Sequence, residues 1–188
     1  MEAGFSGSDS PEGVNFLTAL LVRFPELGSA RLCDGGRLIQ LDFYLQDRVA
    51  EPNFGQFQDH ARLSWDVFFD LQRIEPEIVG LELSEARRGE VAAADVEESE
   101  GTTVDAIQVT RDVDSLTVEE LSLVVTLVRE RFENELAINE EMPAEDASYQ
   151  EEMIHRSLEK IRMGGSEGSL TGFRDDMRVL IYSSQEPR

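Results

Sequence analysis

The chain has 188 residues, with 39 acidic and 17 basic side chains, so its formal net charge is −22 at pH 7. Nucleic acids and anionic membranes attract basic protein surfaces, which this composition can hardly form. We therefore expect neither a nucleic-acid partner nor a membrane partner. The hydrophobic content of 40% is sufficient for a folded core, and the length predicts a single domain over 1–188.

The ends and the cysteine content predict a cytoplasmic protein. Cys33 is the single cysteine, so no intramolecular disulfide can form. The first residues are rich in Gly and Ser and lack the basic start and apolar run of a secretion signal. No stretch approaches the roughly 20 apolar residues that cross a bilayer. We expect 1–9 to be flexible.

The first regular elements are a helix and a β-hairpin. Ser10 and Pro11 are typical of a helix start, and apolar residues at intervals of three and four predict a helix over 11–24. Asp34-Gly35-Gly36 suits a turn with positive φ angles, which predicts a hairpin over 30–45. In its second arm, alternation predicts four inward-facing residues: Ile39, Leu41, Phe43 and Leu45.

A break at Pro52-Asn53 precedes a predicted helix over 54–74 that is rich in aromatic residues. Its apolar positions follow helical periodicity: Phe54, Phe57, Ala61, Trp65, Phe68 and Leu71. Packing of this face against a strand explains the pattern, because aromatic side chains contribute large burial energies. An aromatic pocket for a flat ligand is the alternative.

Two strands and a long acidic segment follow. Alternation predicts strands over 77–86 and 104–113. Between them, 89–103 combines acids with small residues, so we expect an acidic mobile loop.

The clearest helix is predicted over 118–138. Thr117 and Glu120 form a capping box, in which the threonine accepts from the backbone and the glutamate reaches back. Leu123, Val124 and Leu127 widen the apolar stripe of this helix so far that it needs cover on more than one side. Either a following helix over 147–163 or a second copy of the chain could supply it. We therefore expect a homo-oligomer in which these three residues form the interface.

The last third completes an α+β fold. We expect 164–172 to be a flexible connector and Val179–Tyr182 to lie in a buried final strand. The fold class predicted is a two-layer sandwich of helices on a mainly antiparallel sheet of four to five strands. Its element order suggests ferredoxin-like βαββαβ topology, with an added N-terminal helix and hairpin arm and an inserted helix. The extra arm conflicts with that topology, because the first strand of the βαββαβ set already has two neighbours.

Few residues suggest chemistry. Asp112, Asp114 and Glu119 form the best carboxylate cluster, and oxygens of this kind hold Mg²⁺; helix capping explains the same acids. His60 and His155 have no catalytic partner in the sequence, and the glycines of 164–168 lack a P-loop lysine. We therefore predict no catalytic residue and no cofactor.

The leading hypothesis is a non-enzymatic protein-interaction or regulatory module, to which the acidic surface could bring a basic protein partner. The first alternative is a divalent-metal-dependent enzyme that uses Asp112, Asp114 and Glu119. The second is a small-ligand-sensing domain with an aromatic pocket near Phe54, Phe57 and Trp65.

Overall fold

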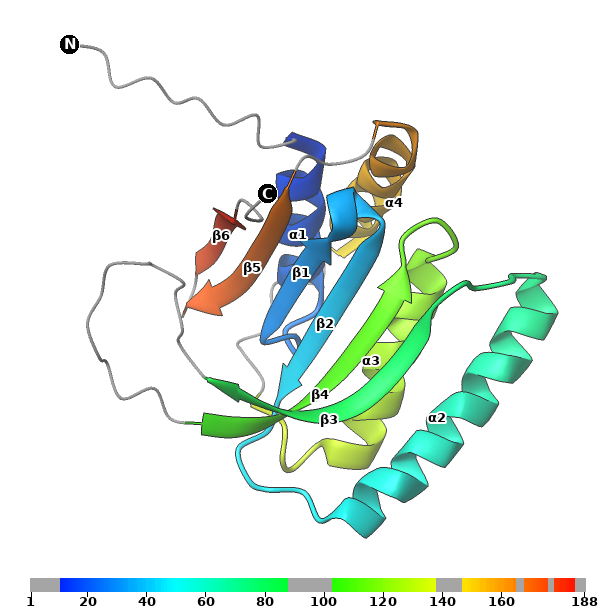
Figure 1. The fold of residues 1–188 in the computed structure, drawn as a ribbon, viewed down its shortest axis with the longest axis vertical. Coiled ribbons are helices and arrows are strands. Elements are labelled where there is room, and N and C mark those ends of the chain that lie inside the picture. Colours follow the sequence, from blue (N-terminus) through cyan, green and yellow to red (C-terminus); the bar gives the residue numbers. More distant parts are fainter. Residues whose placement is uncertain (1–10, 88–102, 138–146, 165–167, 176–177, 185–188) are drawn as a thin grey trace.

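Within the described residues, four helices accompany a six-stranded antiparallel sheet (Figure 1). The computed structural model describes residues 11–87, 103–137, 147–164, 168–175 and 178–184. The predicted α+β class is confirmed, although the sheet has six strands rather than four to five. In chain order the elements are α1 (Pro11–Arg23), β1 (Ser29–Cys33), the 3₁₀ turn η1 (Asp34–Gly36), β2 (Leu38–Tyr44), α2 (Glu51–Gln72), β3 (Val79–Arg87), β4 (Thr103–Asp112), α3 (Val118–Phe132), α4 (Ala147–Gly164), β5 (Ser169–Asp175) and β6 (Arg178–Ser184).

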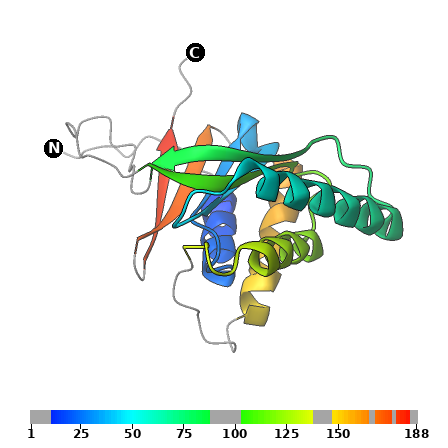
Figure 2. The ribbon, with the colours of Figure 1, turned by 90° about the horizontal axis from the view of Figure 1, so that it is seen from below.

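The helices lie on one side of the sheet, whose strand order is β3-β4-β2-β1-β5-β6. Figure 2 shows α1, α3 and α4 below the sheet, with α2 alongside β3 at the sheet edge. Among the described residues, no helix covers the opposite face. None of the described helices combines the length and the apolar composition that crossing a bilayer requires.

The strand order differs from the ferredoxin-like order that the sequence suggests. In that order the final strand would lie beside β2, but β2 pairs with β4 on one edge and with β1 on the other. The free edge of β1 then pairs with β5, so β6 lies at the far edge of the sheet. The β1–β2 hairpin thus takes the second edge of β2, because a strand can pair on only two sides.

The β1–β2 hairpin matches its prediction. Asp34, Gly35 and Gly36 have φ angles of 50°, 62° and 84°, a conformation that glycine adopts at little cost. The Arg37 backbone N–H donates to the Asp34 carbonyl at 3.2 Å and closes the turn. The four predicted inward-facing residues of the second arm are all at most 1% exposed, which confirms the register.

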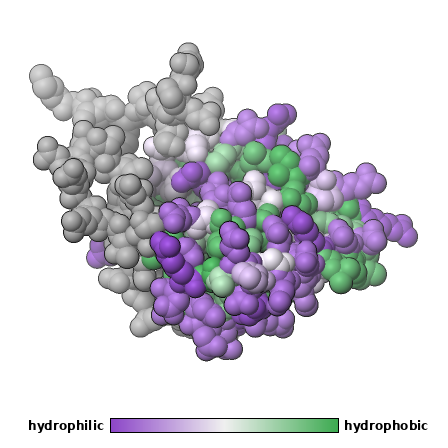
Figure 3. Space-filling model, turned by 60° about the horizontal axis from the view of Figure 1, so that its bottom comes forward, coloured by the Kyte–Doolittle hydropathy of each residue, from purple (hydrophilic) through white to green (hydrophobic). Residues whose placement is uncertain are grey.

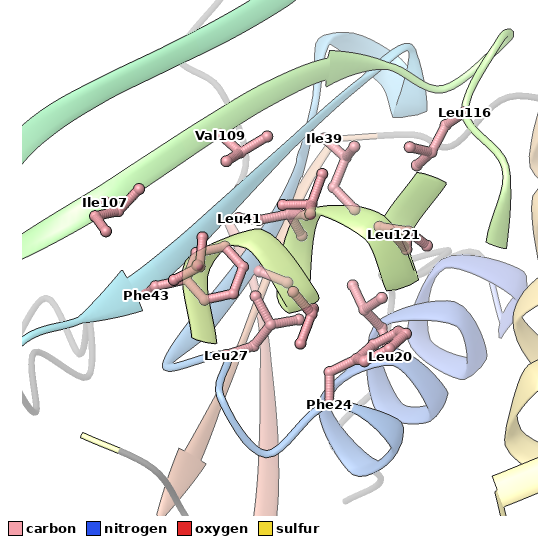
Figure 4. Packing of buried hydrophobic residues seen from close by; sticks show 14 of the residues in the cluster. Leu20, Phe24, Leu27, Ile39, Leu41, Phe43, Ile107, Val109, Leu116 and Leu121 are labelled. Carbon is pink, nitrogen blue, oxygen red and sulfur yellow. The ribbon is translucent and has the colours of Figure 1, made fainter. Parts of the chain in front are cut away.

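The core lies between the sheet and the helices. Figure 4 shows apolar side chains of α1, β2, β4, α3 and the segments after α1 and before α3 converging there. Those labelled are Leu20, Phe24, Leu27, Ile39, Leu41, Phe43, Ile107, Val109, Leu116 and Leu121. The narrow stripe of α4 is buried as well, through Ile154, Leu158 and Ile161. This helix packs mainly along α1.

α2 begins earlier than predicted. The helix includes Glu51 and Pro52, so the proline lies in the first turn rather than in a break before the helix. A proline is well accommodated there, because the first helical N–H groups have no partner within the helix. At the other end, Arg73 adopts the left-handed conformation and the Ile74 N–H donates to the Phe69 carbonyl at 3.0 Å. Both ends of α2 are therefore well defined.

α3 ends at Phe132 rather than at residue 138. The chain then turns to pair with the end of β2, where Leu45 and Leu136 form an isolated bridge. The Ala137 N–H donates to the Tyr44 carbonyl at 2.9 Å. These backbone bonds to β2 replace those that would continue the helix.

The C-terminal segments differ from their predictions. Residues 169–172 lie in β5, although 164–172 is predicted to be a connector. β6 is an edge strand whose Val179–Tyr182 side chains are only partly buried, whereas a buried strand is predicted. The predicted flexible N-terminus 1–9 and all but residue 103 of the predicted acidic loop 89–103 lie outside the described residues.

Candidate functional site

The three predicted metal ligands lie where the chain passes from β4 to α3, but in different environments. Asp112 is the last residue of β4 and is 5% exposed. Asp114 lies in the turn and Glu119 in the first turn of α3, and both are exposed. One carboxylate thus faces the interior while the other two face solvent.

Arg111 is the centre of this corner, although it is not among the residues predicted from the sequence. Its side chain is 1% exposed and forms a bidentate pair with Glu120, which is 0% exposed. Arg111 Nε donates to Glu120 Oε1 at 2.5 Å, and Nη2 donates to Oε2 at 3.0 Å. The alternation of Ile107 and Val109 could have placed Arg111 on the same inward-facing side of β4.

Glu120 therefore completes only half of the predicted capping box. Thr117 Oγ1 accepts from the Glu120 backbone N–H at 3.1 Å, which confirms the threonine as the cap of α3. The Glu120 carboxylate binds Arg111 instead of reaching back to the start of the helix. A buried guanidinium is a stronger partner for a carboxylate than a neutral N–H group.

Asp112 is held by several donors. Its Oδ1 accepts from Arg111 Nη1 and from the backbone N–H groups of Glu77 and Ile78, at 3.1 and 3.0 Å for the latter two. Its Oδ2 accepts from Ser115 Oγ at 2.5 Å and from the Ser115 N–H at 3.1 Å. Burial acts to raise the pKa of Asp112, but the bonds from Ser115 and Ile78 and the Arg111 charge outweigh it, lowering the pKa from 3.8 to about 2.

All the N–H groups of the Arg111 guanidinium have acceptors. Besides Glu120 and Asp112, it donates to the Ile78 carbonyl at 2.6 Å and to Ser115 Oγ at 3.0 Å. These bonds supply five acceptors for its five N–H donors. The Phe69 ring of α2 lies over the same group, with its centroid 5.4 Å from Cζ. Arg111 thus joins β4, α2, α3 and the residue just before β3.

This arrangement favours a structural role for Asp112 over cation binding. Both of its oxygens accept hydrogen bonds from the protein. In the described part of the chain, no group of three or more His, Cys, Asp or Glu side chains gathers as metal ligands would. We call Arg111, Asp112, Ser115 and Glu120 the Arg111 network.

Glu26 is another buried carboxylate, and it ties the turn after α1 to α3. It is 1% exposed and accepts from Arg129 Nη2. Burial lowers the pKa of Arg174 in β5, and the negative charge of Glu26 offsets part of this change. Like the Arg111 network, this group links elements that are distant in the sequence.

The predicted interface residues of α3 face the interior of the same chain. Val124 is 3% and Leu127 is 8% exposed, and Leu123 is partly buried against the core. The cover that these residues need is therefore largely supplied within one chain. The oligomeric state of the protein stays a prediction.

The aromatic residues of α2 pack together against α3. Phe57 makes an edge contact with Phe132 of α3, with ring centroids 5.0 Å apart, and Phe54 lies 6.2 Å from Phe57. Trp65 is 2% exposed, and its Nε1 atom has no hydrogen-bond partner in the described structure. These contacts anchor the inner face of α2.

The two histidines and the cysteine lie apart. His60 is exposed on α2. His155 is exposed on α4, where its Nδ1 lies 3.9 Å from Oε1 of Glu159 on the same helix face. Cys33 at the end of β1 is partly buried. The structure does not bring these three residues into one site.

The outer face of α2 carries a second apolar stripe that is not predicted from the sequence. Leu63, Val67 and Leu71 are 67%, 53% and 77% exposed, and their spacing of four places them side by side along the helix. Leu71 is predicted on the inner aromatic face, where Phe69 is buried instead. We call these three residues the α2 stripe. Figure 3 shows hydrophobic side chains among hydrophilic ones at the end of the molecule where α2 lies.

Acidic residues accompany the α2 stripe. Asp59, Asp66 and Asp70 are all exposed. With about 100° of turn per residue, they lie within about 60° of Leu63, on the side of the helix away from Val67 and Leu71. Over 51–79 the chain has six acids and two arginines, so the local net charge is −4. The α2 stripe and the row of aspartates are the candidate functional surface.

No family model, curated protein or solved structure matches this chain.

Proposed function

We propose that the protein is a non-enzymatic protein-interaction module whose binding surface is the α2 stripe. The observation that carries this proposal is the exposure of Leu63, Val67 and Leu71 in one row. Single exposed apolar residues are ordinary, but adjacent ones of this size are typical of interaction surfaces. Ile78, just before β3, and Val79, its first residue, are 39% and 41% exposed and enlarge the apolar surface at this end of the molecule.

The stripe is presented by a firmly held helix. Phe57 and Phe69 fix the inner face of α2 through Phe132 and Arg111. Gln58 Nε2 also donates to the Leu81 carbonyl of β3 at 2.7 Å. A rigid helix loses little conformational entropy when it binds, which favours recognition through its exposed face.

The experiment is a selection from a random library of displayed peptides, performed on the wild-type protein. The selected peptides are then measured on the variant L63Q/V67Q/L71Q. We expect their affinity to fall at least about tenfold, because apolar anchors carry much of the energy of an interface.

The matched control is Y149Q/M163Q on α4, which removes two exposed apolar side chains, 62% and 82% exposed, from another helix. We expect this variant to bind the same peptides as the wild type does. Peptides that bind L63Q/V67Q/L71Q as tightly as the wild type would show that the α2 stripe is not the binding surface.

A further inference from the structure

We infer that the partner of the α2 stripe is an amphipathic helix whose apolar face is flanked by arginine or lysine. This inference rests on the proposed function and adds the chemistry of the occupant. It is carried by the row of aspartates beside the stripe, together with the local excess of acids.

The shape of the surface favours a helix. Leu63, Val67 and Leu71 form a ridge of residues four apart on a cylinder, and such ridges pack into the grooves of another helix. Figures 1 and 2 show α2 at one end of the molecule, with no described helix or strand beyond its outer side. An added strand is a poorer match, because the α2 stripe offers side chains rather than free backbone groups.

The negative charge around the α2 stripe favours a basic partner. Asp59, Asp66 and Asp70 extend over about three turns, so a partner helix of similar length can place a cation opposite each of them. The segment 51–79 has six acids but only two arginines, Arg62 and Arg73, and no lysine. A second copy would bring the same net charge of −4 to the interface, which opposes self-association through this surface.

Two labelled peptides of about 15 residues test the inference by fluorescence anisotropy. The basic probe carries a row of leucines flanked by arginines, and its acidic twin has glutamate at each arginine position. We expect the basic probe to bind at least about tenfold more tightly than the twin, and more weakly as salt is added.

Three variants locate the binding. L63Q/V67Q/L71Q should abolish binding of the basic probe. D59N/D66N/D70N should weaken it about five- to tenfold and reduce its salt dependence, since exposed charge pairs are individually weak. E130Q/E133Q/E159Q changes the net charge equally at exposed residues of α3, its C-cap and α4, and should change the affinity less than about twofold.

Other outcomes overturn the inference. If the twin binds as tightly as the basic probe and both depend on the α2 stripe, the stripe binds helices without regard to charge. If sedimentation shows a dimer that L63Q/V67Q/L71Q dissociates, the occupant is a second copy. If neither probe binds while the peptide selection gives stripe-dependent ligands, the partner has a different chemistry and the proposed function stands. The proposed function itself fails only when the selection gives no stripe-dependent ligand.

Discussion

The corner between β4 and α3 buries charged side chains, whereas the outer face of α2 exposes apolar ones. At the corner, Arg111, Asp112 and Glu120 are charged and almost fully buried. On α2, Leu63 and Leu71 are apolar and largely exposed. The buried charges are satisfied by one another and by the backbone, whereas nothing in the described structure covers the leucines. The first region therefore stabilises the fold, and the second is available for binding.

The largest effect is expected at Arg111. We expect R111M to lower the free energy of unfolding by about 3–5 kcal/mol, because it leaves the Glu120 carboxylate buried without its partner. Urea unfolding measures this change. R62M, which removes an exposed arginine of α2, is the matched control and should stay within about 0.5 kcal/mol of the wild type.

A double variant tests whether the unpaired Glu120 carboxylate causes this loss of stability. R111M/E120L removes both partners, and we expect it to recover much of the loss, since apolar residues can replace a buried ion pair. A loss of less than about 1 kcal/mol in R111M would show that the network contributes little to stability.

The second prediction concerns the pH dependence of stability. Because the pKa of Asp112 falls from 3.8 to about 2 on folding, its ionised form favours the folded state. The contribution, about 2 kcal/mol, is complete well above pH 3.8 and is lost as the pH falls towards about 2. Urea unfolding of the wild type and D112N at several pH values should show their difference shrinking over this range. D114N, at an exposed residue, should show no such change, and parallel curves for wild type and D112N would contradict the assignment.

Features that depend on neighbouring residues could be predicted from the sequence, whereas features that depend on distant contacts could not. Local patterns were sufficient for the start of α3 at Thr117 and for the alternation of β2, because capping and strand pleat depend on neighbouring residues. The strand order was not predictable, since β1 pairs with β5 across some 140 residues. That pairing depends on which edge is free after the hairpin has formed.

The candidate site was harder to predict than the fold. Among the acids near α3, only burial distinguishes Glu120, which pairs with Arg111, from the exposed Glu119. On α2 the helical period allows two apolar faces, and the pattern alone assigns Leu71 to the aromatic one. The structure shows that Phe69 takes this position, because its ring packs over Arg111. A contact with a distant strand therefore decides which apolar residues remain outside.

The smallest expected effect is the sharpest test of the comparison. We expect L63Q/V67Q/L71Q to change the free energy of unfolding by less than about 1 kcal/mol, because surface substitutions usually cost little. L121A, at a core position of α3 that is 1% exposed, should cost about 2–5 kcal/mol in the same assay. Trp65, the single tryptophan, lies on the inner face of α2, so its fluorescence reports whether the helix stays docked. Unchanged emission together with unchanged stability would show that these three side chains are not needed for folding, as expected of a surface that serves binding. A large loss of stability would instead place the α2 stripe among the residues that hold the fold together.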